Sequence, residues 1–266
     1  MHISNLEQPI IEQEDYGPLI RYLKSLEHYL VYSTVIRPYT RRRFHVTHHV
    51  KRKFFYSVTI TNLTESVDLS ILACLASDCL RPDIRPIDLL DLFRKYCCCD
   101  QTYLDPNCPT TAILVNFYHS LRTDRFLCRW CQGRQLLVTR YRNHYLFSAN
   151  QPIGQRLRRD IRRLLGSSGF TFEDRRSRFC DRNHRPVNFF GIGLDRDSNL
   201  IPTKRFTTKL RGLLHRAITK RDVPPAAIRT RMGQFKKILS LTSRPPTKQE
   251  QRILCTYSQW KHQNPS

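Results

Sequence analysis

Residues 135–149, QLLVTRYRNHYLFSA, contain the pattern that most restricts how this chain folds. Apolar and polar residues alternate on both sides of the short polar run 142–144, a pattern typical of two strands joined by a tight turn. Tyr141, Tyr145 and Phe147 predict a half-buried ladder, and the polar run is expected at its tip. Such a hairpin commits the chain to an antiparallel sheet.

The segments around this hairpin alternate between helical and extended patterns. Aromatic and β-branched residues predict a strand over 54–63, and shorter strands are expected within 170–181 and 185–195, followed by a turn at 195–199. Helical spacing of apolar residues predicts helices over 18–34, 67–80, 86–98, 110–127, 153–169, 204–221 and 226–241. This order is that of an α+β domain with an antiparallel sheet and packed helices, followed by a helical subdomain.

The net charge of +23, from 45 Lys and Arg against 22 Asp and Glu, indicates a polyanionic partner. Arginine dominates this excess, and its planar guanidinium suits bidentate contacts with phosphate. We therefore expect the protein to bind nucleic acid through three basic segments, although the first of them, 37–53, also reads as a solvated loop. The candidate residues are Arg41, Arg42, Arg43, Lys51, Arg52, Lys53, Arg156, Arg158, Arg159, Arg162, Arg163, Lys204, Arg205, Lys209, Arg211 and Arg216.

The ten cysteines favour a reducing compartment over a disulfide framework. Cys128 and Cys131 form a single C-x-x-C pair, whereas a structural zinc site needs a second pair of ligands at suitable spacing. We expect buried thiols here, no bound metal and no cofactor. No apolar run is long enough to span a membrane, and the acidic start of the chain resembles neither a signal peptide nor a transit peptide. The expected location is intracellular, in the cytoplasm or the matrix of an organelle such as the mitochondrion, and not secreted.

Four stretches follow one another with characteristic spacing. They are VTITNLTESV at 58–67, LDPNCPTTAILVN at 104–116, RYRNHYLFS at 140–148, and a segment from Val187 to Ile218 that contains Gly191 and Pro202. Together they resemble the palm and thumb of retron-type and group II intron-type reverse transcriptases, over roughly residues 44 to 240. The resemblance implies a palm with an antiparallel sheet, reduced fingers and a helical thumb-like C-terminal subdomain.

The same resemblance places the family's three catalytic aspartates at Thr59, Asn143 and His144. Polymerases of this kind use two divalent cations, and Mg²⁺ requires oxygen ligands that include carboxylates. Since all three positions are neutral here, the resemblance implies a degenerate site with no catalytic residue and no metal. Three acids lie near these motifs in sequence and could be considered as replacements: Glu65, Asp68 and Asp105. Glu65 and Asp68 are expected beyond the end of the strand at the head of a helix, where their expected role is to cap that helix.

The sequence therefore predicts an N-terminal helix and basic segment over 1–43, a palm-like domain over 44–200, and a thumb-like subdomain with a tail over 201–266. The favoured function is that of an inactive reverse-transcriptase-like scaffold that binds structured RNA in a ribonucleoprotein with other proteins. An organellar ribosome component, a splicing or maturase-like factor and a retroelement-derived system all fit. The alternatives are an active RNA-directed DNA polymerase whose carboxylates come from elsewhere, and a non-catalytic subunit of a polymerase.

Overall fold

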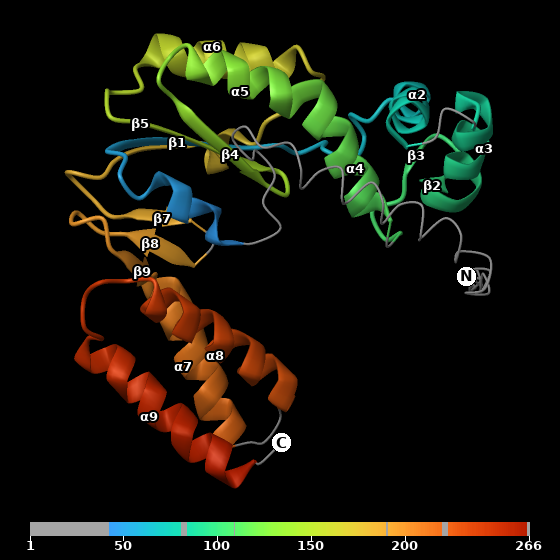
Figure 1. The fold of residues 1–266 in the computed structure, drawn as a ribbon. Coiled ribbons are helices and arrows are strands. Elements are labelled where there is room, and N and C mark those ends of the chain that lie inside the picture. Colours follow the sequence, from blue (N-terminus) through green and yellow to red (C-terminus); the bar gives the residue numbers. More distant parts are fainter. Residues whose placement is uncertain (1–42, 81–83, 109, 190, 220–222, 265–266) are drawn as a thin grey trace, which may run out of the picture. The chain divides into compact units, whose positions relative to one another are not determined.

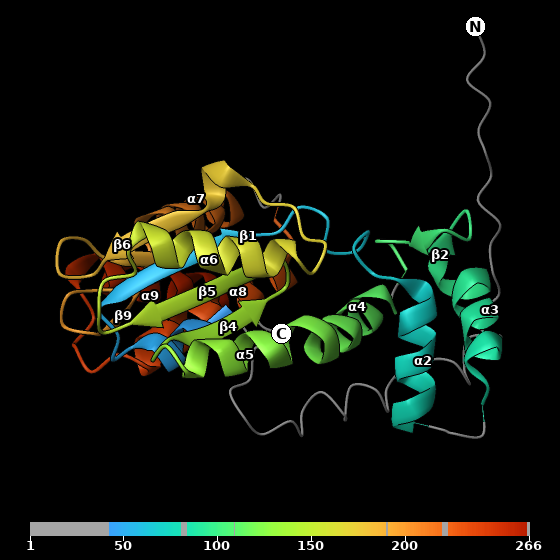
Figure 2. The same cartoon turned by 90° about the horizontal axis from the view of Figure 1, so that it is seen from above.

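The computed structural model describes residues 43–80, 84–108, 110–189, 191–219 and 223–264 (Figures 1 and 2). The predicted helix over 18–34 lies outside these residues, as do Arg41 and Arg42. The described residues form two compact units, one made of 60–129 and 164–171 and the other of 43–59, 130–163 and 172–264. These bounds differ from the domain boundaries expected from the sequence, which stay a prediction.

In the first unit, the helices predicted over 67–80 and 86–98 are confirmed as α2 (Leu69–Leu80) and α3 (Pro86–Cys97). Asp68 starts α2, because its carboxylate accepts a hydrogen bond from the backbone N–H of Ile71 at 3.0 Å. The two helices pack against each other around side chains that include the fully buried Phe93.

The helix predicted over 110–127 forms as three consecutive segments. They are α4 (Thr111–His119), a single π-helical turn η3 (Ser120–Asp124) and α5 (Arg125–Gln132). A hairpin of two-residue strands, β2 (Cys98–Cys99) and β3 (Tyr103–Leu104), precedes them and was not predicted. Strands this short carry no detectable alternation.

The second unit contains an antiparallel sheet with strand order β4-β5-β1-β6. Its strands are β1 (Phe54–Thr59), β4 (Leu137–Tyr141), β5 (His144–Ala149) and β6 (Arg178–Asp181). The predicted hairpin is confirmed as β4 and β5. β1 ends earlier than predicted, because the chain turns directly after it, with the N–H of Ser66 donating to the carbonyl of Asn62 at 3.0 Å.

Two expectations for the hairpin were wrong. His144 is not part of the tip, since it begins β5 and pairs with Tyr141, which leaves only Arg142 and Asn143 in the turn. Arg142 adopts a positive φ of 56° there. The ladder is also not half-buried, because Leu146 lies on the opposite face from Tyr145 and is buried as well.

Both faces of the sheet are covered, which explains this burial. Helix α6 (Gln155–Gly166), predicted over 153–169, lies over the face that carries Tyr56, whose hydroxyl accepts a hydrogen bond from Arg162 Nε at 2.9 Å (Figure 2). We call this the α6 face. A 3₁₀ segment η2 (Arg43–His49) covers part of the other face, where the ring nitrogens of His49 lie 2.6 Å from Ser148 Oγ and 2.8 Å from Thr139 Oγ1. We call this the η2 face.

A short 3₁₀ helix, η4 (Asp174–Arg176), precedes β6, and a second, three-stranded antiparallel sheet follows it. Its strands are β7 (Val187–Phe189), β8 (Ile192–Leu194) and β9 (Leu200–Pro202). The ring of Phe189 lies 6.2 Å from that of Phe55, so this sheet packs on the η2 face. The predicted turn between β8 and β9 is confirmed, with the N–H of Ser198 donating to the carbonyl of Asp195 at 3.2 Å.

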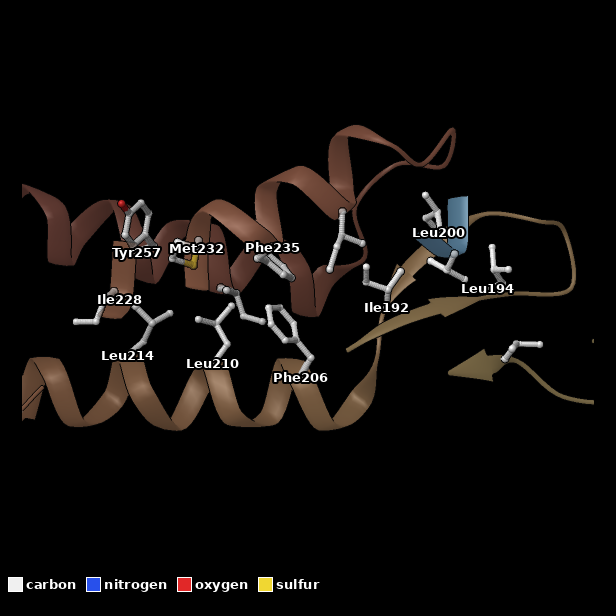
Figure 3. Close-up of a cluster of buried hydrophobic side chains, with 14 of the residues drawn as sticks. Ile192, Leu194, Leu200, Phe206, Leu210, Leu214, Ile228, Met232, Phe235 and Tyr257 are labelled. Atoms are coloured by element: carbon white, nitrogen blue, oxygen red, sulfur yellow. The ribbon is translucent and has the colours of Figure 1, made fainter. Parts of the chain in front are cut away.

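Three helices complete the unit: α7 (Lys204–Thr219), α8 (Pro225–Ser240) and α9 (Lys248–Gln263). The first two were predicted, but α9 occupies what was expected to be a tail. Figure 3 shows α7 and α8 packing around side chains such as Leu210 and Phe235, and this apolar cluster continues into β8 and β9. None of the helices within the described residues is long and apolar enough to cross a membrane.

Candidate nucleic-acid interface

Thr59 and His144, two of the three positions where the resemblance would place aspartates, face each other across neighbouring strands. They are directly paired in the β1–β5 register, and Thr59 Oγ1 lies 2.9 Å from His144 Nδ1. Thr59 is only 2% exposed. The structure therefore brings these two residues together at the end of β1. Asn143 lies in the turn, directly before His144, and it does not line the cavity described next.

A cavity of about 360 Å³ opens on the η2 face beside this pair. Its walls come from β1, β5, β6, β7 and the first turn of α7. Three arginines line it, Arg178 from β6, Arg185 from the segment before β7, and Arg205 from α7. The side chains that line this cavity include no carboxylate, so the local charge is strongly positive.

The start of α7 reaches the cavity because the β7–β8 turn packs closely against it. Gly191 in this turn has a φ of +91°, a conformation that few residues other than glycine adopt. A Cβ atom at Gly191 would lie 3.0 Å from the ring of Phe206, and the carbonyl of Gly191 accepts a hydrogen bond from the N–H of Thr203 at 2.9 Å. These contacts fix Arg205, the neighbour of Phe206, beside the strand that forms the cavity wall.

The residues around this corner do not fit a pair of Mg²⁺ ions. The corner offers a hydroxyl, an imidazole and guanidinium groups, whereas Mg²⁺ requires oxygen ligands with carboxylates among them. Glu173 donates its backbone N–H to the carbonyl of Thr59 at 3.0 Å, but its side chain does not line the cavity. Nowhere in the part of the chain that the structure describes do three His, Cys, Asp or Glu side chains gather as a metal site would require.

Two of the acids considered as replacements, Asp68 and Asp105, have local roles in the first unit. Asp68 caps α2, and the Asp105 carboxylate accepts a hydrogen bond from the N–H of Asn107 at 2.8 Å. Glu65 is exposed. The C-x-x-C cysteines Cys128 and Cys131 are both buried, and burial raises the pKa of Cys128 to about 12. A thiol in this state is a poor metal ligand, because zinc binds the thiolate.

The predicted basic residues on α6 divide into two groups. Arg158 and Arg162 face the sheet, where the Arg158 guanidinium lies 4.9 Å from the centre of the Phe179 ring and Arg162 is bonded to Tyr56 and Asp174. The other three are exposed: Arg156, Arg159 and Arg163. Arg163 pairs with Asp160 on the surface of the helix at 3.6 Å, whereas Arg156 and Arg159 make no ion pair within the described residues and are the most available to a phosphate.

The predicted basic residues of α7 are all exposed: Lys204, Arg205, Lys209, Arg211 and Arg216. Three of them, Arg205, Lys209 and Arg216, recur at helical spacing and form one stripe that starts at the cavity. Lys51, Arg52 and Lys53 precede β1, at the opposite end from Thr59, about 20 Å away at roughly 3.3 Å per residue. Arg43 begins η2.

The predicted basic residues therefore do not form one surface. Those of α6 lie on one face of the four-stranded sheet, while Arg205 lies at a cavity on the other face. Sequence reasoning missed Arg178 and Arg185, which belong to the cavity. Residues 175–185 are rich in arginine, which could have indicated a further basic segment. Assigning Arg178 to the cavity, however, requires the pairing of β6 with β1, which places Arg178 opposite Ser57.

No model of a protein family matches this chain, and none of the curated proteins does. Solved structures do match, and several of them are telomerases of Candida species. The structure of Candida albicans telomerase in complex with a fragment of telomeric RNA has a TM-score of 0.56 at 10% identity, over 94% of this chain and 50% of that one.

Two structures of Candida tropicalis telomerase without RNA are also similar to it. The first has a TM-score of 0.56 at 9% identity over 93% of this chain, and the second, truncated from its C-terminal domain, has a TM-score of 0.50 at 8% identity over 75%. This chain corresponds to about half of each telomerase chain, 51% and 50% respectively. The predicted fold class, an α+β reverse-transcriptase-like palm with a helical thumb-like subdomain, is confirmed by these similarities and by the antiparallel sheet.

Proposed function

We propose that this protein is a catalytically inactive reverse-transcriptase-like protein that binds structured RNA as a scaffold. The observation that carries the proposal is the corner at the end of β1, where a hydroxyl and an imidazole lie 2.9 Å apart beside three arginines. The sequence resemblance would place carboxylates at these two positions. Two-metal nucleotidyl transfer requires negative charge at that place to hold the cations. Positive charge favours a phosphate there instead.

Two further facts support RNA as the partner. The net charge of +23 favours a long polyanion, and double-stranded RNA is recognised largely through its shape and its backbone. Two of the telomerase structures similar to this chain, those of Candida albicans and Candida tropicalis, were determined with a fragment of telomeric RNA. Because this chain spans half of those proteins, it is proposed to share a mode of RNA binding with them and not their activity.

The setting of this scaffold is proposed from the sequence. A retron-type or group II intron-type ancestor is consistent with the motifs around Thr59 and His144, and a ribonucleoprotein with further protein subunits is the expected assembly. The proposed location is the matrix of an organelle such as the mitochondrion, or the cytoplasm.

The test is to crosslink the protein to RNA in its native cells, purify it and sequence what is bound. We expect one dominant structured RNA, such as a ribosomal RNA or an intron, whose identity would name the assembly. Recovery of no enriched RNA together with a co-purified polymerase chain would contradict the scaffold and favour a non-catalytic polymerase subunit.

A parallel assay addresses catalysis directly. The purified protein is given a primed RNA template with deoxynucleotides and either Mg²⁺ or Mn²⁺, alone and with its co-purified proteins. We expect no extension in any of these mixtures. Metal-dependent extension that is lost on substitution of Thr59 or His144 would show an active polymerase and overturn the proposal.

A further inference from the structure

The cavity beside Thr59 and His144 is more specific than a surface that only attracts RNA. Its arginines converge from three separate elements, β6, the segment before β7, and α7, onto one space of about 360 Å³. Pockets of this size hold small ligands, and 360 Å³ is ample for a nucleotide. Four strands and one helix carry most of the residues that line it.

The charges in this cavity lack the compensation that other arginines of the chain have. Arg244 is bidentate to Glu250, and Arg162 is paired with Asp174. In contrast, Arg178, Arg185 and Arg205 make no ion pair within the residues that the structure describes. Arg185 donates one hydrogen bond, from Nη2 to the carbonyl of Phe179 at 2.8 Å, which leaves most of its donors for a ligand.

The other residues that line the cavity are uncharged or apolar, and they indicate which groups can lie beside a bound phosphate. Thr59 and His144 line one side of the cavity, where their side chains lie 2.9 Å apart. Phe189 and Val187 from β7 form an apolar wall, and Phe189 is only partly buried. Guanidinium groups hydrogen-bond to phosphate oxygens, and a partly exposed aromatic ring provides a surface on which a base can stack.

We propose that this cavity binds the terminal phosphate monoester of an RNA strand, with the stripe of Arg205, Lys209 and Arg216 guiding the strand that leads to it. A phosphate monoester carries a charge near −2 at neutral pH, whereas an internal phosphodiester carries −1. Three guanidiniums around one space match the higher charge. This inference rests on the proposed RNA binding and adds that a strand end is the part recognised.

The experiment measures binding of the full chain to one RNA sequence in three forms, at fixed salt. The forms carry a 5′-phosphate, a 3′-phosphate, or hydroxyl groups at both ends. We expect one of the phosphorylated forms to bind about tenfold more tightly than the hydroxyl form, because the monoester gains charge-assisted hydrogen bonds. In the variant Arg178→Gln/Arg185→Gln this ratio should fall to about one.

A matched control removes the same charge elsewhere. Arg229→Gln/Arg231→Gln changes two exposed arginines of α8 that do not line the cavity, and it should retain the tenfold preference. Thermal unfolding of both variants checks that they are folded, which is expected because all four side chains are exposed.

The contrary outcomes are distinct. If all three RNA forms bind equally well, the end-recognition inference is wrong while RNA binding stands. If no RNA binds at all, the proposed function fails and the inference fails with it. If adenosine 5′-monophosphate alone displaces the phosphorylated RNA as effectively as a second phosphorylated RNA does, the ligand is a free nucleotide and the strand-end assignment is overturned.

Discussion

Thr59 and His144 face each other across β1 and β5, so acidic side chains at these positions would have Cβ atoms about 4.5–5.5 Å apart. That separation allows two carboxylates to share one divalent cation. We therefore expect the variant Thr59→Asp/Asn143→Asp/His144→Asp to bind Mn²⁺ with a dissociation constant of about 10⁻⁴ to 10⁻³ M, weakened by the nearby arginines. Electron paramagnetic resonance of Mn²⁺ measures this binding.

The matched control carries asparagine at 59 and 144, which keeps the size of the side chains and removes their charge. It should not bind Mn²⁺ in the same range. A folded triple-aspartate variant that also fails to bind Mn²⁺ would contradict this prediction.

A second prediction at this scale concerns Glu250 at the start of α9. Its carboxylate accepts two hydrogen bonds from Arg244, at 2.7 and 2.8 Å, and one from the N–H of Thr247 at 2.7 Å. Burial favours a higher pKa for Glu250, but these hydrogen bonds outweigh it and leave the pKa below its ordinary value of 4.5. Glu250→Gln should destabilise the protein by about 1–3 kcal/mol near neutral pH.

The pH dependence follows from the direction of this shift. A carboxyl group whose pKa is lower in the folded state stabilises the protein fully above its unfolded pKa, and this contribution is lost as the pH falls through the folded pKa. The wild-type protein should therefore lose more stability than Glu250→Gln between pH 6 and pH 3. Urea unfolding of both proteins at several pH values tests this, and parallel curves would contradict it.

At the scale of elements, most segments with a clear hydrophobic period were predicted, whereas helix α9 and the burial of both sheet faces were not. Most described helices and the β4–β5 hairpin followed from spacing alone. Helix α9 was missed although its signals were present, because Thr247 and Glu250 form a capping box and Ile253, Tyr257 and Trp260 recur at helical spacing. The burial of both sheet faces was not predictable, since it depends on which distant segments cover the sheet.

The arginines of helix α6 that face the sheet are expected to stabilise the fold, whereas the exposed ones are not. Arg158 stacks on Phe179, and Arg162 bonds to the hydroxyl of the buried Tyr56. Arg158→Ala/Arg162→Ala should therefore lower the free energy of unfolding by about 1–3 kcal/mol, through lost packing and the lost hydrogen bond. The control Arg159→Ala/Arg163→Ala, with the same loss of charge on exposed positions, should change it by less than about 1 kcal/mol. Equal effects in chemical denaturation would show that the inward arginines do not stabilise the sheet.

Helices α6 and α7 also allow the RNA-binding face to be identified. Their exposed basic residues lie on different sides of the palm-like sheet, and only the α7 stripe begins at the arginine-lined cavity. Replacing Arg205, Lys209 and Arg216 with alanine should weaken RNA binding about 10- to 100-fold, as expected for three lost phosphate contacts. Replacing Arg156, Arg159 and Arg163 should weaken it less. Equal losses in fluorescence anisotropy titrations would place both faces in the interface.

At the scale of the whole molecule, sequence and structure contribute different parts of the candidate site. The resemblance assigned Thr59 and His144 to one family site, but their direct pairing became visible only in the register of β1 and β5. The inclusion of Arg178 and Arg185 was not predictable, because β6 is separated from β1 by more than one hundred residues and only the register places Arg178 opposite Ser57. The composition shows the excess of positive charge, but it does not show that the basic residues are divided between the two faces of the four-stranded sheet.

The distribution of charge sets the last prediction, which concerns salt. With a net charge of +23, the protein should bind structured RNA through several phosphates at once, and each contact releases condensed counterions. We expect the logarithm of the association constant to fall linearly with the logarithm of the salt concentration, with a slope of about −4 to −6 if five to seven phosphates are neutralised. The variant without the three α7 side chains should show a slope shallower by about 2–3. A flat response in titrations between 50 and 300 mM potassium chloride would mean that uncharged contacts dominate, and the excess of arginine would then need a different partner to explain it.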